Sequence, residues 1–132
     1  MRCALFRRYT IRLIAFAVVS AAPAMTFAAE PGELAFKNRC RTCHSVREGD
    51  NRMGPSLHGI VGAQAGSSQG AAYSQALKSS DIVWDEEKLD AFIENPDAVV
   101  PGNNMKPYGG LPNPEERKQI IRYLKSAAEQ KT

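Results

Sequence analysis

Two cysteines and a histidine lie close together in the segment CRTCH, residues 40–44. Residues three and four positions apart share one face of a helix, so a helix here would place Cys40, Cys43 and His44 on the same side. Both thiols can then form thioether bonds to the vinyl groups of one porphyrin, and the imidazole can reach the iron. The spacing therefore predicts a covalently attached c-type haem, with Cys40 and Cys43 as attachment points and His44 as an iron ligand.

Cysteine pairs with this spacing also occur in zinc sites and in redox-active dithiols. A structural zinc site needs about four protein ligands, but the sequence has no second Cys-x-x-Cys, and His58 alone does not complete such a site. A thioredoxin-like dithiol begins a helix that follows a strand, whereas residues 36–39, just before the motif, have a helical pattern. Haem attachment is the interpretation that we favour.

The second axial ligand decides what a haem iron can do. The candidates are Met53, His58 and Met105. Met53 follows His44 by only nine residues and would have to reach the opposite haem face in one short loop. Met105 follows it by 61 residues, which lets the chain pass around the ring, and prolines on both sides stiffen its loop. We predict that Met105 is the distal ligand, with Met53 and His58 as the alternatives.

The first 28 residues have the pattern of a cleavable secretory signal, with a boundary uncertainty of two residues. Arginines at positions 2, 7, 8 and 12 precede an apolar stretch at 13–24, and small residues follow. This stretch is shorter than the roughly 20 residues of a membrane span, so cleavage is favoured over a retained anchor. A twin-arginine signal fits less well, because Thr10 stands where that signal usually has phenylalanine. We expect export to a bacterial periplasm and one small domain at 29–132.

Removal of the signal changes the charge balance and the cysteine content. The whole chain has 17 basic and 14 acidic residues. Four of the basic residues lie in the signal, so 13 remain against 14, and the charge gives no indication of a nucleic-acid partner. Cys3 is lost with the signal. The remaining pair, Cys40 and Cys43, would form a disulfide in an oxidising compartment unless the haem claims both thiols.

Charge is distributed unevenly along residues 29–132. Basic residues surround the haem motif, whereas acidic residues predominate between 81 and 97. Such a separation can orient a charged partner before contact. An ordinary solvated surface is the alternative interpretation.

The pattern of apolar residues, prolines and glycines predicts helices joined by ordered loops, with almost no strand. The last helix is expected to begin near Pro114, and Asp85 is an N-cap candidate for a helix that Pro96 ends. A haem would supply the large apolar body that so small a helical domain needs for its core. The expected elements are a helix at 32–44, a glycine-rich loop at 49–70, a short helix at 71–79, an extended piece at 81–84, a helix at 86–95, an irregular segment at 99–107 and the last helix from 114.

From Gly32 to Ala128 the chain resembles the class I cytochromes c, close to the mitochondrial and related bacterial carriers. The resemblance rests on CRTCH at 40–44, on GPSLHG at 54–59, on PGNNM at 101–105 and on the residues that pack the first helix against the last. It implies a small all-α cytochrome c fold around one covalent haem c with iron. It also implies roles for single residues of the haem pocket. The Pro55 carbonyl would hold the ligand imidazole, Tyr73 and Trp84 would donate to a haem propionate, and His44 and Met105 would bind the iron.

Some positions depart from the pattern of this family. Ala63 stands where the mitochondrial type usually has an arginine near the buried propionate. Leu77 and Phe92 replace polar residues that organise a buried water near the methionine. Asp97 and Asn104 stand where lysines commonly ring the haem edge, so the docking surface need not be the mitochondrial one.

The resemblance implies a soluble one-electron carrier rather than an enzyme. Its partners would be redox proteins that make transient contact at the haem edge, with membranes involved only through partner complexes, and it would act as a monomer. Two alternatives share the haem site. One is a dedicated electron-transfer subunit of a dehydrogenase or oxidase complex. The other is a haem peroxidase, which the sequence disfavours because no distal histidine and arginine pair is evident.

Overall fold

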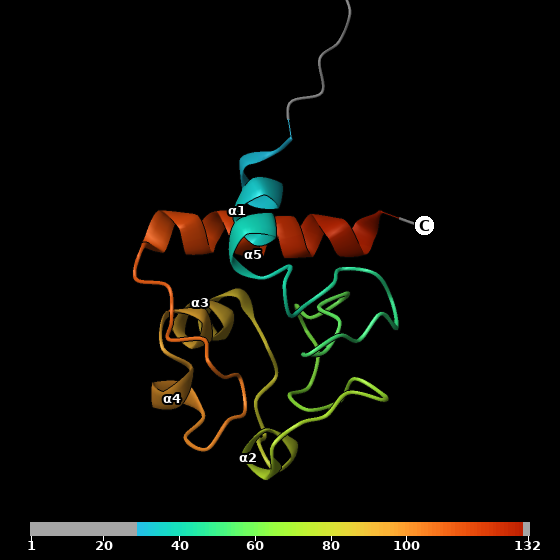
Figure 1. Ribbon diagram of the computed structural model, residues 1–132, viewed down its shortest axis with the longest axis vertical. Coiled ribbons are helices and arrows are strands. Elements are labelled where there is room, and N and C mark those ends of the chain that lie inside the picture. The colour runs from blue at the N-terminus through green and yellow to red at the C-terminus, as the bar shows by residue number, and fades with distance from the viewer. Residues whose placement is uncertain (1–28, 131–132) are drawn as a thin grey trace, which may run out of the picture.

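The computed structural model describes residues 29–130, so the predicted signal at 1–28 lies outside the described residues. Strand pairing within 29–130 is limited to one antiparallel bridge between Gln64 and Val83. This helical architecture confirms the predicted all-α class. None of the helices in the described part is long and apolar enough to cross a membrane. The helices are α1 (Pro31–Arg39), α2 (Gln75–Lys78), α3 (Glu86–Glu94), α4 (Pro96–Val99) and α5 (Pro114–Glu129) (Figure 1).

Helix α1 crosses α5 at one end of the molecule, as Figure 1 shows. Gly32 lies at the crossing, where an added Cβ would collide with the Gln119 carbonyl and come within 2.9 Å of Tyr123 Cβ. The Phe36 and Tyr123 rings pack with their centroids 5.4 Å apart. Ile120 on α5 is fully buried. The predicted packing of the first helix against the last is confirmed, and it fixes the segment that follows α1.

Helix α3 packs beside α5 and is tied to it by Arg117. The guanidinium is buried and donates from Nε and Nη2 to the two carboxylate oxygens of Asp90, at 2.9 and 3.0 Å. Its Nη1 donates to the Leu111 carbonyl at 2.9 Å. The start of α3 is capped as predicted, because the Asp85 carboxylate accepts from the Lys88 N–H at 2.7 Å.

The prediction of one helix through 32–44 was wrong at its end. Helix α1 ends at Arg39, and Cys40 is its C-cap. The Phe36 carbonyl accepts from the N–H groups of both Cys40 and Arg41, at 2.8 and 3.1 Å, which breaks the regular α-helical pattern. The motif continues as a turn in which the His44 N–H donates to the Cys40 carbonyl at 2.9 Å. That turn, rather than a helix face, brings the motif side chains together.

Two further helix predictions differ in extent from the structure. The helix expected at 71–79 is confined to α2, because the Ser74 hydroxyl accepts from the Leu77 N–H and so defines a late N-terminus. Pro96 does end α3, but it also begins α4, which Asn95 caps. The chain from 100 to 113 is irregular, in agreement with the prediction for most of that segment.

Candidate haem site

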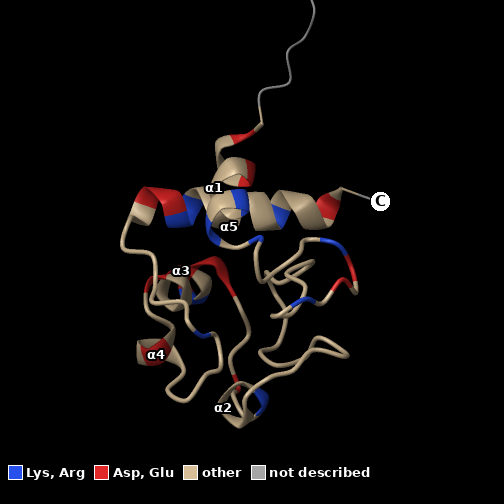
Figure 2. Cartoon of the chain, viewed as in Figure 1, with Lys and Arg blue, Asp and Glu red and all other residues tan. Residues whose placement is uncertain are grey.

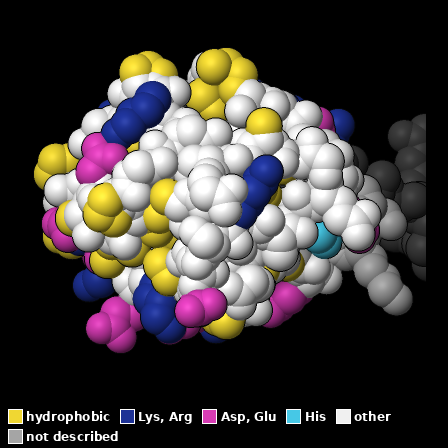
Figure 3. Space-filling view, turned by 90° about the horizontal axis from the view of Figure 1, so that it is seen from below, with side chains coloured by type: hydrophobic (Ala, Val, Ile, Leu, Met, Phe, Trp, Pro, Cys, Tyr) yellow, Lys and Arg dark blue, Asp and Glu magenta, His cyan; other side chains and the backbone are white. Residues whose placement is uncertain are grey.

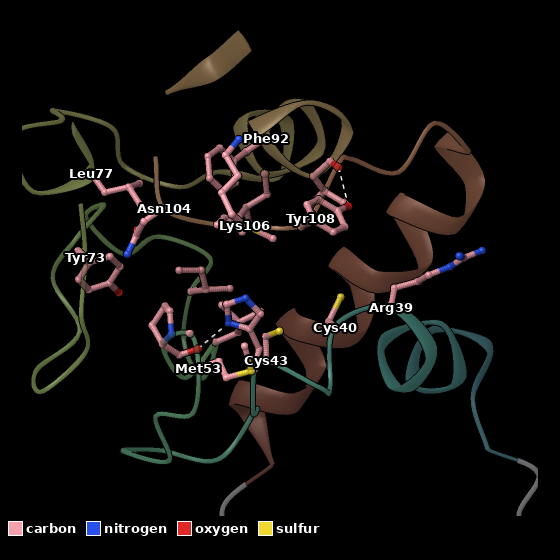
Figure 4. Close-up of a pocket in the computed structure, with 18 of the residues that line it drawn as sticks. Arg39, Cys40, Cys43, Met53, Tyr73, Leu77, Phe92, Asn104, Lys106 and Tyr108 are labelled. Carbon is pink, nitrogen blue, oxygen red and sulfur yellow. Dashed lines mark hydrogen bonds between the residues drawn. The ribbon is translucent and has the colours of Figure 1, made fainter. Parts of the chain in front are cut away.

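A cavity of about 190 Å³ lies beneath the crossing of α1 and α5. A single buried water needs only about 10–15 Å³, so the space is far larger than a solvent site. The cavity is bounded by α3, by α5 and by the loops around 53–60, 72–77 and 104–108 (Figure 4). Its walls are mainly apolar, and include Leu57, Leu77, Trp84, Phe92, Ile120 and Leu124.

Both predicted attachment cysteines line this cavity, and each is partly buried and free of a disulfide. Burial, together with the negative charge of Glu116, raises the pKa of Cys40 to about 12. Cys40 is therefore a neutral thiol near pH 7. Zinc sites and redox-active dithiols use thiolates, and reactive cysteines of this spacing have lowered pKa values. The raised pKa of Cys40 is the opposite of the lowered value that a redox-active dithiol of this spacing has.

His44 is 7% exposed, and its Nδ1 lies 2.8 Å from the Pro55 carbonyl oxygen. A carbonyl only accepts, so Nδ1 carries the proton and donates, and Nε2 keeps its lone pair. Burial lowers the pKa of His44, although the Pro55 hydrogen bond opposes this, and the neutral imidazole is favoured. Within residues 29–130 the Nε2 atom has no hydrogen-bond partner. It is therefore available to a metal.

Gly54 makes room for that imidazole. A Cβ at this position would lie 2.8 Å from Nδ1 and 3.0 Å from Nε2 of His44, closer than van der Waals contact allows. The backbone of Gly54 thus packs flat against the ring. From the sequence alone Gly54 is only part of a loop motif, because nothing local indicates which side chain it contacts.

The three candidates for the distal ligand lie in different settings. His58 is bonded elsewhere, with its Nδ1 3.2 Å from the Val46 carbonyl oxygen. Met53 lines the cavity but is 75% exposed, and it lies next to Cys43 in Figure 4. Met105 is partly buried, packs against the core and also lines the cavity.

The side of the cavity on which each methionine lies separates Met53 from Met105. Met53 precedes Gly54, which packs on the His44 ring, so Met53 is on the histidine side. The neighbours of Met105 in the chain, Asn104 and Lys106, lie across the cavity from Met53 in Figure 4. Met53 and Met105 thus come from different segments of the cavity wall.

The predicted pocket residues also line the cavity. Pro55 supplies the carbonyl described above. Trp84 is 4% exposed and packs on Phe92, with ring centroids 4.9 Å apart. Tyr73 is partly buried, and burial raises its pKa.

Tyr108 is a cavity residue that the sequence analysis missed. Its hydroxyl donates to the Ile93 carbonyl at 2.7 Å, and burial raises the pKa of Tyr108 to about 12. No motif marks it, because its partner lies 15 positions away.

The charged side chains at the cavity are paired. Arg39 donates from Nε to Glu116 at 2.7 Å, and Lys106 donates to Asp97. The cavity therefore combines an apolar interior, two thiols, a neutral imidazole with a free Nε2 and a partly buried methionine in its wall. These residues fit a covalently held haem, because the set supplies two attachment points and two possible iron ligands around an apolar space.

The comparisons with known proteins agree with this fit. The model of the family described as "Cytochrome c" matches residues 29–128. A cytochrome c from Euglena viridis is 42% identical over 98 residues, which are 74% of this chain and 95% of the relative. One from Gibberella zeae is 41% identical over 93 residues, 70% and 87% of the two chains. The solved cytochrome cH from Methylobacterium extorquens is 40% identical with a TM-score of 0.67, covering 73% of this chain and 95% of that one.

Family model, relatives and fold therefore agree over most of the length of the chain. Relatives of this kind are electron carriers and not enzymes, and they hold one haem c covalently. The spacing of Cys40 and Cys43 is the one that such attachment requires. The chain belongs to the cytochrome c family.

Proposed function

We propose that this protein is a periplasmic one-electron carrier whose haem c is attached at Cys40 and Cys43 and ligated by His44 and Met105. The single observation on which the proposed iron ligation rests is the hydrogen bond from His44 Nδ1 to the Pro55 carbonyl, at 2.8 Å. It fixes the tautomer and the ring orientation, and it leaves Nε2 unshared beside a cavity that Met105 also lines.

Within this proposal each element of the site has a task. When bound, the haem iron supplies a one-electron couple, and a His/Met ligand pair raises its potential and leaves no open coordination position. His44 is held by Pro55 on one side and by the Gly54 backbone against its ring. Leu77 and Phe92 exclude water from the interior. Trp84 and Tyr73 supply donors for a propionate. The residues hold both ligands still, so the change of oxidation state needs little reorganisation.

The proposed location follows from the first 28 residues. They are inferred to direct export and then to be removed, which leaves a domain at 29–132 that acts as a monomer. In an oxidising periplasm the thiols of Cys40 and Cys43 can form a disulfide until the haem is attached to them.

Redox partners are proposed to make brief contact where the cysteines approach the surface. Figure 2 marks basic residues after α1 and acidic residues around α3 and α4. Several of these charges neutralise one another, as in the pairs of Lys125 with Glu86 and Lys88 with Asp85. Seen from the α2 end in Figure 3, both signs are interspersed. This supports brief, low-charge contact more than long-range steering by a strong dipole.

Absorbance spectra of the oxidised and reduced protein test the ligation. Protein made with the haem-attachment machinery is expected to show the weak far-red band that a methionine sulfur gives on ferric iron. Met105→Ala should lose that band and lower the reduction potential. Met53→Ala is the matched control and should keep both, because Met53 lies on the histidine side. A Met105→Ala spectrum identical to that of the wild type would exclude Met105 as the ligand.

A further inference from the structure

Two consecutive asparagines precede Met105 in the irregular segment that follows α4. Asn103 is buried, with 5% of its surface exposed, whereas Asn104 is exposed. Figure 4 shows the Asn104 side chain directed toward the segment of Tyr73. The Asn103 side chain instead bonds to residues of α4 and its C-cap. The two amides therefore tie the Met105 segment to two different parts of the chain.

The Asn103 side chain makes three hydrogen bonds. Its Nδ2 donates to Asp97 Oδ1 at 2.9 Å and to the Val100 carbonyl at 3.0 Å. Its Oδ1 accepts from the backbone N–H of Met105 at 3.0 Å. A primary amide can make about four such bonds, so Asn103 is nearly saturated. Because the group is buried, each lost bond leaves a polar atom with little access to water. Asn103 thereby fixes the Met105 backbone to α4.

The Asn104 side chain makes two bonds to a segment 30 or more positions earlier in the chain. Its Oδ1 accepts from the Ser74 N–H and its Nδ2 donates to the Ala72 carbonyl, both at 3.1 Å. The amide thus pairs with a donor and an acceptor of one backbone, as a neighbouring strand would. These bonds join the Met105 segment to the residues on either side of Tyr73, which lines the cavity.

The nearby ion pair is the weaker restraint. Lys106 Nζ and Asp97 Oδ2 are in contact, but the two side chains are 52% and 60% exposed. Exposed pairs of this kind contribute little, because water and salt screen them. The buried bonds of Asn103 are therefore a stronger restraint on the position of Met105 than this ion pair, and the two exposed bonds of Asn104 add to them.

We propose that Asn103 and Asn104 are positioning residues, which together form an amide clamp that holds Met105 toward the iron and resists its displacement. This inference rests on the proposed ligation by Met105. An external ligand can take the place of Met105 only if the segment moves, and movement breaks bonds on at least one side of the clamp. Loss of one net hydrogen bond corresponds to roughly a fivefold change in such an equilibrium.

Titration of the ferric holoprotein with imidazole tests the clamp, with loss of the far-red band as the signal. Asn104→Ala is expected to raise the apparent association constant of imidazole about fivefold or more. Asn104→Asp keeps the acceptor for the Ser74 N–H but loses the donor to the Ala72 carbonyl. Its association constant for imidazole should therefore lie between those of the wild type and Asn104→Ala. Asn103→Ser tests the bonds of the buried Asn103 amide. If Asn103→Ser does not fold, the Asn104 variants still test the clamp, because Asn104 is exposed and its substitution leaves the core intact.

Asn113→Ala is the matched control. Asn113 caps α5, where its Oδ1 accepts from the N–H groups of Glu115 and Glu116 at 3.0 and 3.2 Å. The variant removes a similar number of backbone bonds without touching the Met105 segment. Its imidazole constant should stay within about twofold of the wild-type value, even though its denaturation midpoint falls.

The possible results separate the clamp from the ligation on which it rests. If Asn104→Ala and Asn113→Ala raise the imidazole constant equally, the effect is general destabilisation and the clamp is refuted. If the wild-type protein shows the far-red band but Asn104→Ala binds imidazole as the wild type does, the clamp alone is wrong. If the wild-type protein lacks the band, the ligation by Met105 fails and the clamp fails with it.

Discussion

Substitution of Gly54 by alanine would place a methyl group in the space that the His44 imidazole occupies. The added Cβ would lie 2.8 Å from Nδ1 and 3.0 Å from Nε2, where carbon contacts normally begin near 3.5 Å. Either the ring or the backbone must therefore move by about 0.5 Å or more. A displaced ring can no longer keep the 2.8 Å bond from His44 Nδ1 to the Pro55 carbonyl at its present geometry, so we expect this bond to be weakened or lost.

The cost of this change has two parts. Overpacking of a tight site costs about 1–3 kcal/mol. Loss of the histidine hydrogen bond adds about 1 kcal/mol. We expect Gly54→Ala to lower the free energy of unfolding of the holoprotein by about 2–4 kcal/mol. Guanidinium denaturation, followed by far-UV circular dichroism, measures this loss as a lower midpoint at unchanged slope.

Gly109→Ala is the control for this experiment. A Cβ at Gly109 would meet nothing within 4 Å, and its φ angle is not in the positive range that disfavours side chains. The variant should stay within about 0.5 kcal/mol of the wild type. Equal midpoints for the Gly54 and Gly109 variants would refute the reasoning, because they would show that the imidazole is not confined by residue 54.

Three further results are expected. Asp90→Ala removes the carboxylate that pairs twice with the buried Arg117 guanidinium and leaves only the more exposed Glu94, 3.3 Å from Nη1, so it should cost about 3 kcal/mol in denaturation experiments. Lys125→Ala, which breaks an exposed pair, should shift the midpoint no more than its replicate error. The hydrogen bond from Lys88 lowers the pKa of Asp85, so this carboxylate stabilises the fold above its unfolded pKa of about 3.9. This contribution is lost as the pH falls through the lower folded pKa. The free energy of unfolding of Asp85→Asn should therefore differ from that of the wild type at pH 6 and converge with it in strong acid. Protein in which both motif cysteines are replaced, and which holds no covalent haem, should lack a cooperative thermal transition in calorimetry, because its apolar cavity is unfilled; an apoprotein that melts sharply would contradict this.

Local signals account for the parts of the fold that the sequence predicted well. Asp85 precedes a run of acidic residues and an apolar stripe, and it caps α3 as its position suggests. Pro114 begins α5 for the same kind of reason, since its fixed φ suits a first turn. Both signals act within one helical turn of the residue concerned, so tertiary contacts are not needed to interpret them.

The features that the sequence did not predict depend on partners far along the chain. The end of α1 is set by two N–H groups that share the Phe36 carbonyl, an arrangement with no sequence signature. The Asn104 amide finds its partners at Ala72 and Ser74, and only the folded chain brings these segments together. The family resemblance likewise indicated a loop that carries Met105, but not the contacts that hold that loop in place.

The crossing of α1 on α5 joins the first and last helices of the domain, and this order has a consequence for biosynthesis. Helix α1 has nine residues, too few to be stable alone in water. Its packing partner α5 begins only at Pro114, so α1 and the adjacent cysteines have nothing to dock against until that later part of the chain has been made. The packing that positions the cysteine motif therefore forms only after α5 has been synthesised.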